Sequence, residues 1–326
     1  MRTLTFLVVW MAALCFESMA QAATTSRLHH IRDAGVINCG VAGDMPGFSE
    51  LSSASATGMD VDICRGLAAA LLGSADRARF TRISGIKEFL SRRDVDVVFH
   101  GLTWTFEREA RWNIRFGPVT YYDGAGLVLP RMAAARHVLE LNNAAICIHA
   151  DYPSLEPLRR FLASGSNLRL IAYASEHESR EAFHSGHCTA LGGDASTLVT
   201  SASGHNPRQF EILQDRITKE PLAPIVRATD DDLLMLLRLV VYATIQAEEL
   251  GIGSTSAASP IDAAFPPASQ LGLPMPDGWA SRVILGIGNY AEIFERNFSR
   301  PDRIGQNRGL NRLWRDGGLM YAPPSK

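Results

Sequence analysis

The chain has 326 residues, of which 46% are hydrophobic, and its 32 Lys and Arg residues nearly balance 34 Asp and Glu residues. This length is enough for a large core divided between two domains. The formal net charge of −2, without any run of basic residues, excludes nucleic acid as an expected partner.

The first 23 residues have the features of a secretory signal. Arg2 precedes a short apolar stretch at residues 4–16, and an A-x-A pattern at residues 20–22 predicts cleavage after Ala22 or Ala23. The apolar stretch is too short to span a membrane. A lipoprotein anchor at Cys15 is disfavoured because bulky Leu14 precedes it. We therefore expect a soluble, exported mature protein.

Removal of the signal leaves four cysteines, and an even number in an oxidising compartment favours disulfides. Three pairings are open. The favoured one keeps each bridge inside one domain and joins Cys39 to Cys64 and Cys147 to Cys188. Four buried free thiols are the alternative.

The first half of the mature chain predicts a β-α-β-α-β unit. Strands are expected at residues 36–42, 80–83 and 95–99, and a short helix at residues 86–90. Another helix is expected between the first two strands, with Asp60 as its candidate N-cap and Gly73 as its end. This order of elements favours a parallel sheet.

The stretch GLTWTFERE at residues 101–109 directly follows the third of these strands. Thr105 is a good N-cap for a helix that would follow. In open α/β sheets, ligands bind at the carboxyl ends of the strands, where this stretch would lie. Thr103 offers a hydroxyl and an N–H group, and Arg108 offers a fork of donors suited to a carboxylate. Without further support, an Arg in a first helical turn is more often a solvated residue.

A second unit begins near Arg131 and repeats the plan of the first. Strands are expected at residues 145–149, 168–173 and 189–194, with helices at residues 153–163 and 178–184. Asp194 ends the third strand. Crossings between the two units are expected at residues 126–130 and 221–227.

The C-terminal third is expected to be mostly helical. Asp230 or Asp231 caps a long helix at residues 233–249, and residues 279–298 form an amphipathic helix. Residues 253–276 are rich in Ser, Ala and Pro, which predicts a loop with one short turn. A last helix is expected at residues 308–314.

Taken together, the sequence resembles the extracytoplasmic solute-binding proteins of polar amino-acid ABC transporters, in particular the general L-amino-acid-binding subgroup. The matches follow one another over nearly the whole mature chain, and all four mature cysteines lie where the subgroup has them. The matching stretches are GMDVDICR at 58–65, LTWT at 102–105 with Arg108, VTYYDG at 119–124, DAS at 194–196, AEEL at 247–250, GNY at 288–290, FERN at 294–297, RGLNRLW at 308–314, GGL at 317–319 and YAPP at 321–324.

The resemblance implies an α/β fold of the two-lobed periplasmic-binding-protein type (type II, clamshell), with a hinge of two crossing strands. It implies a first lobe from residues 24–128 and 226–326 and a second lobe from residues 129–225. The expected function is capture of an amino acid or related small zwitterion in the periplasm by lobe closure, with delivery to an ABC transporter permease in the inner membrane. The family further implies a monomer that is not an enzyme and needs neither cofactor nor metal.

Family roles carry over onto three matching positions. Arg108 would pair with the ligand's α-carboxylate, Thr103 would contact the charged ends of the ligand, and Asp194 would take its α-ammonium group. Burying a zwitterion requires a counter-charge and hydrogen bonds at each end, so these residue types suit the task. The carbonyl of Gly101 is a weaker candidate for an additional hydrogen-bond acceptor. Met45, Phe48 and Trp104 are weaker candidates for walls around the ligand side chain, with core packing as the alternative for these three.

One stretch departs from the family. Where relatives have Gly-Thr-Thr after the first strand of the second lobe, this chain has DYPS at residues 151–154. Asp151 would fill the anion site at the helix start and repel a carboxylate, and Pro153 has no N–H group. We therefore hypothesise that the ligand is not an ordinary neutral L-amino acid, that binding is weak, or that a cationic ligand group meets Asp151.

Two other functions remain as alternatives. A dehydratase-like enzyme on the same fold could use Asp151 or His149 as acid or base, and a ligand-sensing module could lack a transport role. Other motifs are better explained by chance or by structure: S-x-x-K at residues 84–87, a loose G-x-G-x-x-A at 286–291, and HSGHC at 184–188.

Overall fold

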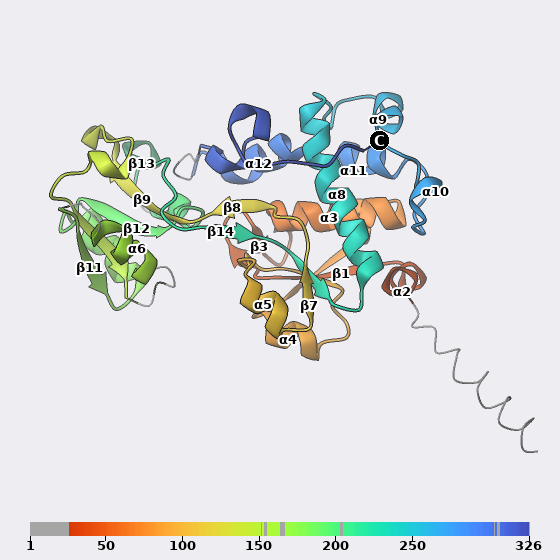
Figure 1. The fold of residues 1–326 in the computed structure, drawn as a ribbon, viewed down its shortest axis with the longest axis horizontal. Coiled ribbons are helices and arrows are strands. Elements are labelled where there is room, and N and C mark those ends of the chain that lie inside the picture. Colours follow the sequence, from red (N-terminus) through yellow and green to blue (C-terminus); the bar gives the residue numbers. More distant parts are fainter. Residues whose placement is uncertain are drawn as a thin grey trace, which may run out of the picture.

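The computed structural model describes residues 26–325, apart from residues 151, 153–154, 164–166, 203–204, 303 and 305–306. The expected export signal and Asp151 therefore lie outside the described residues. The described chain forms two lobes, each built around a five-stranded mixed sheet. In Figure 1 the second lobe lies on the left in yellow and green, and the first lobe combines the orange and blue ends of the chain.

The first sheet has the parallel centre that the β-α-β-α-β order predicts. Strand β1 pairs in parallel with β5 on one side and β6 on the other, whereas β15 runs antiparallel to both β6 and β7. The return of the chain after the second lobe explains this reversal, because β15 enters the sheet from the opposite end. The strand order is β5 (Ala78–Arg82), β1 (Ile37–Val41), β6 (Val97–Phe99), β15 (Ile225–Arg227) and β7 (Ile114–Phe116).

The second sheet repeats this pattern. Strand β10 is parallel to β11 and β12, and β9 is antiparallel to β12 and β13. Strand β10 has the bounds that its apolar run predicts. The strand order is β11 (Arg169–Tyr173), β10 (Ala145–His149), β12 (Ala190–Asp194), β9 (Ala125–Pro130) and β13 (Phe210–Ile212).

Two antiparallel strands connect the lobes, β8 (Tyr121–Asp123) and β14 (Glu220–Leu222). They lie side by side between the two sheets (Figure 1). The first crossing between the lobes was expected at residues 126–130. These residues instead belong to β9, a strand of the second sheet, and the chain passes from the first lobe to the second earlier, at β8. A three-stranded sheet of β2 (Asp44–Met45), β3 (Ser49–Leu51) and β4 (Ala56–Thr57) lies in the first lobe.

Apolar side chains cover both faces of each sheet, as expected for parallel strands buried on both sides. In the first sheet, Cys39 and Val97 face one core cluster and Val98 faces another. In the second sheet, Ile146 and Cys147 likewise belong to different clusters. Within the described residues, every helix is too short or too polar to span a lipid bilayer.

The helices follow the apolar periodicity of the sequence more closely near the sheets than near the C-terminus. Helix α3 packs against α8 and α11 in the first lobe. The helices are α2 (Arg27–Ala34), α3 (Met59–Leu72), α4 (Ile86–Ser91), α5 (Phe106–Arg111), α6 (Leu155–Ala163), α7 (Glu176–His184), α8 (Asp231–Glu249), α9 (Ala258–Ala264), α10 (Ala268–Leu271), α11 (Trp279–Ile287) and α12 (Tyr290–Phe298). The 3₁₀ turns are η1 (Ala75–Arg77), η2 (Arg131–Ala133), η3 (Val138–Glu140), η4 (Leu198–Thr200), η5 (Pro207–Gln209), η6 (Gly309–Asn311) and η7 (Trp314–Asp316).

Four local predictions were wrong. Residues 253–276 contain two helices, α9 and α10, rather than one turn, and the expected last helix is a pair of 3₁₀ turns, η6 and η7. The helix expected over residues 279–298 breaks at Gly288, which adopts a positive φ of 86°. Asp60 is not the N-cap of α3, because Gly58 holds that position and Asp60 is buried inside the first turn.

Each lobe contains one disulfide. Cys39 on β1 is bonded to Cys64 on α3, and Cys147 on β10 is bonded to Cys188 just before β12. These are the two pairs favoured by the sequence. Each bridge ties a strand from the parallel part of a sheet to a segment beside it, so each lobe is cross-linked independently of the other.

Candidate functional site

On the first lobe, Arg108 is held at the start of α5 by local hydrogen bonds. The Thr105 hydroxyl accepts a hydrogen bond from the Arg108 N–H, so Thr105 caps the helix as its sequence position predicts. The Arg108 Nη1 group donates to the Thr103 carbonyl oxygen at 2.7 Å. Within the described residues Arg108 forms no ion pair with a carboxylate. Most of its donors thus remain available to an incoming anion.

The backbone before Arg108 has a shape that only glycine fits well. Gly101 has φ +55°, and a Cβ atom at this position would lie 2.6 Å from Cε of Met45. Gly101 and Met45 are therefore in contact at the end of β6. Thr103 forms an antiparallel bridge with Leu222 of β14, which ties this loop to one of the two strands that connect the lobes.

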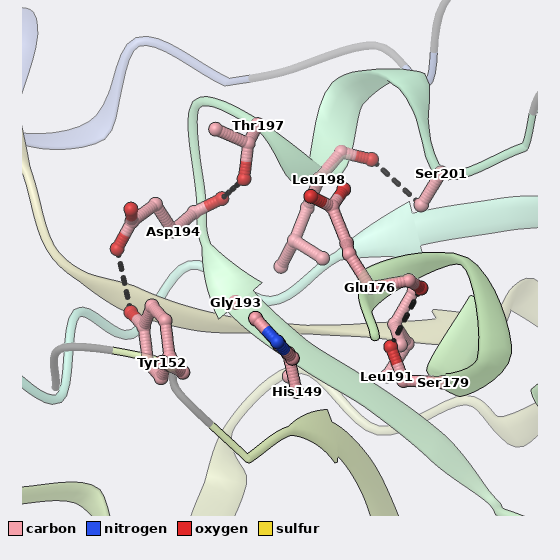
Figure 2. A pocket seen from close by; sticks show the side chains of 11 residues that line it. His149, Tyr152, Glu176, Ser179, Leu191, Gly193, Asp194, Thr197, Leu198 and Ser201 are labelled. Carbon is pink, nitrogen blue, oxygen red and sulfur yellow. Dashed lines mark hydrogen bonds between the residues drawn. The ribbon is translucent and has the colours of Figure 1, made fainter. Parts of the chain in front are cut away.

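On the second lobe, Asp194 ends β12 and faces Tyr152. The Tyr152 hydroxyl donates a hydrogen bond of 2.6 Å to Oδ1 of Asp194 (Figure 2). Burial raises the pKa of Asp194 to about 7, the neighbouring carboxylates of Glu220 and Asp123 add to the rise, and the hydrogen bond from Tyr152 opposes it. Near neutral pH, both the charged and the protonated form of Asp194 are therefore populated.

A second buried carboxylate fixes the backbone beside Asp194. Asp123 ends the connecting strand β8 and accepts hydrogen bonds from the backbone N–H of Ser196, at 3.2 Å, and from the Ser196 hydroxyl. Burial raises the pKa of Asp123 to about 6. Through this contact the connecting strand holds the segment that follows Asp194.

A cavity of about 200 Å³ lies beside Asp194 at the carboxyl ends of β10 and β12 (Figure 2). Polar and apolar groups both contribute to its wall. Glu176 at the start of α7 faces it and pairs with Arg180 at 2.8 Å. The lining residues are His149, Tyr152, Glu176, Ser179, Leu191, Gly192, Gly193, Asp194, Thr197, Leu198 and Ser201.

The predicted contact residues fall into separate groups in this structure. Asp194 lines the cavity, whereas Gly101, Met45, Thr103 and Arg108 belong to the first lobe and do not line it. Of the two remaining described wall candidates, Trp104 does not line this cavity, and the Phe48 side chain is 1% exposed and packs edge-on against the Tyr121 and Phe298 rings. In this structure Phe48 serves the core, which was the alternative given for it.

Several polar cavity residues were not singled out from the sequence: Tyr152, Glu176, Ser179, Thr197 and Ser201. Tyr152 could have been found, because it lies in the DYPS stretch that departs from the family. Glu176 and Thr197 follow strands of the second unit, but nothing in their local sequence distinguishes them from helix-starting residues. The described residues contain no group of three or more His, Cys, Asp or Glu side chains placed to hold a metal ion.

Known proteins resemble this chain over most of its length, although no protein-family model matches it. Protein YhdW of Escherichia coli (strain K12) is 34% identical over 322 residues, which cover 93% of this chain and 94% of YhdW. The general L-amino acid-binding periplasmic protein AapJ of Rhizobium johnstonii is 33% identical over 321 residues, covering 94% of each protein. An ABC transporter periplasmic binding protein from Brucella ovis, solved with glutathione bound, aligns with a TM-score of 0.73 at 29% identity over 93% of this chain and 100% of its own.

Proposed function

We infer the function from one premise: this chain belongs to the family of periplasmic amino-acid-binding proteins of ABC transporters. It is a solute-binding protein that captures an amino acid or related small zwitterion for an ABC transporter. We further propose that it acts as a monomer, delivers the ligand to the inner-membrane permease, and loses its signal after Ala22 or Ala23.

We propose that the ligand binds between the lobes, with Arg108 on one side and Asp194 on the other. The observation that carries this proposal is the equivalent position of the two residues. Arg108 follows the last strand of the first β-α-β-α-β unit, Asp194 ends the last strand of the second, and the two units are joined by β8 and β14. The Arg108 guanidinium, which has no carboxylate partner among the described residues, suits the ligand α-carboxylate. Asp194, whose pKa is raised by burial and further by the neighbouring carboxylates, suits an ammonium group.

Closure of the lobes would complete this site. A zwitterion leaves water at a large cost unless both of its charges are paired. Because each lobe supplies only one of the two counter-charges, the closed form is stabilised only when a ligand supplies the opposite charges. We propose that β8 and β14 act as the hinge, since they are the paired strands that pass between the sheets.

The cavity beside Asp194 would take the polar part of the ligand beyond its α-amino group. The hydroxyls of Ser179, Thr197 and Ser201 already donate to backbone carbonyls, so they offer only acceptor oxygens there. Glu176 offers a carboxylate. The Brucella ovis protein binds glutathione, a ligand larger than one amino acid. The proposed ligand class therefore includes related zwitterions as well as amino acids. Asp151, outside the described residues, remains the reason to test cationic ligands as well.

A thermal-shift screen tests the proposal. Refolded, ligand-stripped mature protein would be screened against amino acids, small peptides, zwitterions and amines. A ligand that binds only the folded state at a hundredfold excess over its dissociation constant stabilises it by about 2.7 kcal/mol. We expect shifts with zwitterions that are lost in Arg108→Ala.

Arg111→Ala is the matched control for this screen, because Arg111 lies on the same helix, is exposed and pairs only with Glu107 at 3.2 Å among the described residues. It should keep the shifts of the wild type. If no amino acid or zwitterion shifts the wild type, or if Arg108→Ala shifts as the wild type does, the proposed site is wrong. Turnover of a bound ligand would instead favour the dehydratase-like alternative.

A further inference from the structure

A second cavity, of about 230 Å³, lies in the first lobe between α8, the C-terminal segment and the chain that leads into β8. Neither Arg108 nor Asp194, the two residues proposed to pair with the charges of the amino acid, lines it. Trp104, which follows Thr103, lines this cavity instead of the one beside Asp194. Neighbouring residues in an extended segment point to opposite sides, which explains why Thr103 and Trp104 serve different surfaces.

Three buried apolar side chains form the floor of the second cavity. Phe116, Ile245 and Met320 are at most 4% exposed and pack into the first lobe. The Trp104 ring is 39% exposed and stacks on Phe116 with ring centroids 6.1 Å apart. Its Nε1 group donates to Oε2 of Glu109 at 2.8 Å, which fixes the ring. A fixed, partly exposed Trp over an apolar floor is a good wall for a flat ring.

The rim of the cavity offers hydrogen-bond donors that the protein does not use. Arg238, Tyr242 and Ile245 lie on one face of α8 at i, i+4 and i+7, and Tyr122 faces them from β8. Both phenols line the cavity, and burial and, to a lesser extent, Tyr242 raise the pKa of Tyr122. In the described part of the chain, Arg238 and the two phenol hydroxyls have no hydrogen-bond or ion-pair partner.

We propose that this cavity is a second ligand site, which takes a small aromatic carboxylic acid. Its ring would lie against Trp104 over the apolar floor, and its carboxylate would accept from the Arg238 guanidinium and the phenols of Tyr122 and Tyr242. Arg binds a carboxylate through two parallel hydrogen bonds, and the aromatic wall binds the ring.

The same residues argue against an amino acid here. Glu109 is the one carboxylate that lines the cavity, and its oxygens already accept hydrogen bonds from Trp104 Nε1 and, at 3.4 Å, from the Phe116 N–H. An ammonium group would therefore find only an engaged partner and would be repelled by the Arg238 guanidinium. An anion with an apolar ring fits the donors and the floor; the Glu109 charge opposes it, and the Arg238 charge offsets that repulsion.

The test is calorimetric titration of the full mature protein with phenylacetate, with benzylamine as the cationic control of similar shape. We expect phenylacetate to bind and benzylamine not to bind. Arg238→Gln should weaken phenylacetate binding by about tenfold or more, because it removes the charge-assisted pair. Arg108→Ala and Arg111→Ala should leave phenylacetate binding unchanged.

Each other outcome overturns the proposal. Absence of phenylacetate binding at about 10 mM would place any affinity below a useful range. Equal binding by wild type and Arg238→Gln would show non-specific association, and loss of binding in Arg108→Ala would assign phenylacetate to the amino-acid site. If Arg238→Gln does not fold, Tyr242→Phe and Arg238→Lys replace it, and both must weaken phenylacetate binding while the thermal shift with the amino-acid ligand is kept.

Discussion

The two half-sites for the ligand follow equivalent β-α-β-α-β units but have opposite electrostatic settings. Arg108 keeps most of its donors free, with one hydrogen bond to the Thr103 carbonyl and no carboxylate partner among the described residues. Asp194 is crowded by Glu220 and Asp123 and is capped by the Tyr152 hydroxyl. The anion-binding half-site therefore carries its charge and free donors before the ligand binds, whereas the carboxylate of the cation-binding half-site is stabilised in its charged form only when a cation binds.

The largest expected effect comes from removing either half-site. Arg108→Ala or Asp194→Ala should each weaken ligand binding by about thirtyfold or more, because truncating one partner of a buried charge pair costs roughly 2–5 kcal/mol. Titration calorimetry with the best ligand from the screen measures this loss. Arg111→Ala, on the same helix as Arg108, should bind within about twofold of the wild type because exposed ion pairs contribute little. A loss of less than about fivefold in both site variants would contradict the two-charge site.

The next effect is a pH dependence carried by the second half-site. The pKa of Asp194 is raised to about 7, so at lower pH the carboxyl group holds a proton that must leave before it can pair with an ammonium group. Affinity should therefore fall by about tenfold per pH unit below that pKa and level off above it. Binding at pH 7 should also release a proton, which titrations in buffers of different ionisation enthalpy detect. An affinity that stays constant between pH 5 and pH 8 would sink this account.

A smaller effect is expected from Tyr152→Phe. This change keeps the ring but removes the hydroxyl that donates to Asp194 at 2.6 Å. The hydrogen bond holds the pKa of Asp194 down, so its loss should move the pH midpoint of binding upward. At pH 7 the affinity should fall by about threefold to tenfold, in line with a hydrogen bond to a charged group. Tighter binding by the variant would show that Tyr152 competes with the ligand for Asp194.

The smallest effect, in the opposite direction, is expected from Glu220→Gln. The Glu220 charge raises the pKa of Asp194, so its removal should move the pH midpoint of binding downward by a fraction of a unit. Gln can still accept the hydrogen bond that the Thr218 hydroxyl donates to Oε1 at 2.9 Å. Tyr152→Phe and Glu220→Gln thus form a matched pair. Shifts of the midpoint in the same direction would contradict the electrostatic account of Asp194.

The sequence predicted best the parts of the fold that depend on short-range patterns. Apolar runs located β1, β6 and β10, and Thr105 and Gly73 bound their helices as predicted. These positions depend on burial of alternate faces and on capping hydrogen bonds within a few residues. Such short-range interactions correspond to patterns that can be recognised in the local sequence.

Other features depend on contacts that the sequence order does not encode. Gly58 rather than Asp60 begins α3, because the Asp60 side chain is buried at 3% exposure instead of turning back to cap the helix. Residues 253–276 are rich in Ser and Pro, yet α9 and α10 form there and bury Ile261 and Ala268 against the first lobe. The Tyr152–Asp194 bond joins residues 42 positions apart. No local pattern indicates such a pair.

Small-angle X-ray scattering shows directly whether the lobes close when one ligand meets Arg108 and Asp194 together. The radius of gyration of the ligand-stripped wild type should fall when the best ligand from the screen is added at saturation, whereas Asp194→Asn at the same ligand concentration should remain as extended as the free protein. If the wild type binds the ligand without becoming more compact, or if Asp194→Asn closes as the wild type does, then the two residues do not act as the opposite halves of one site.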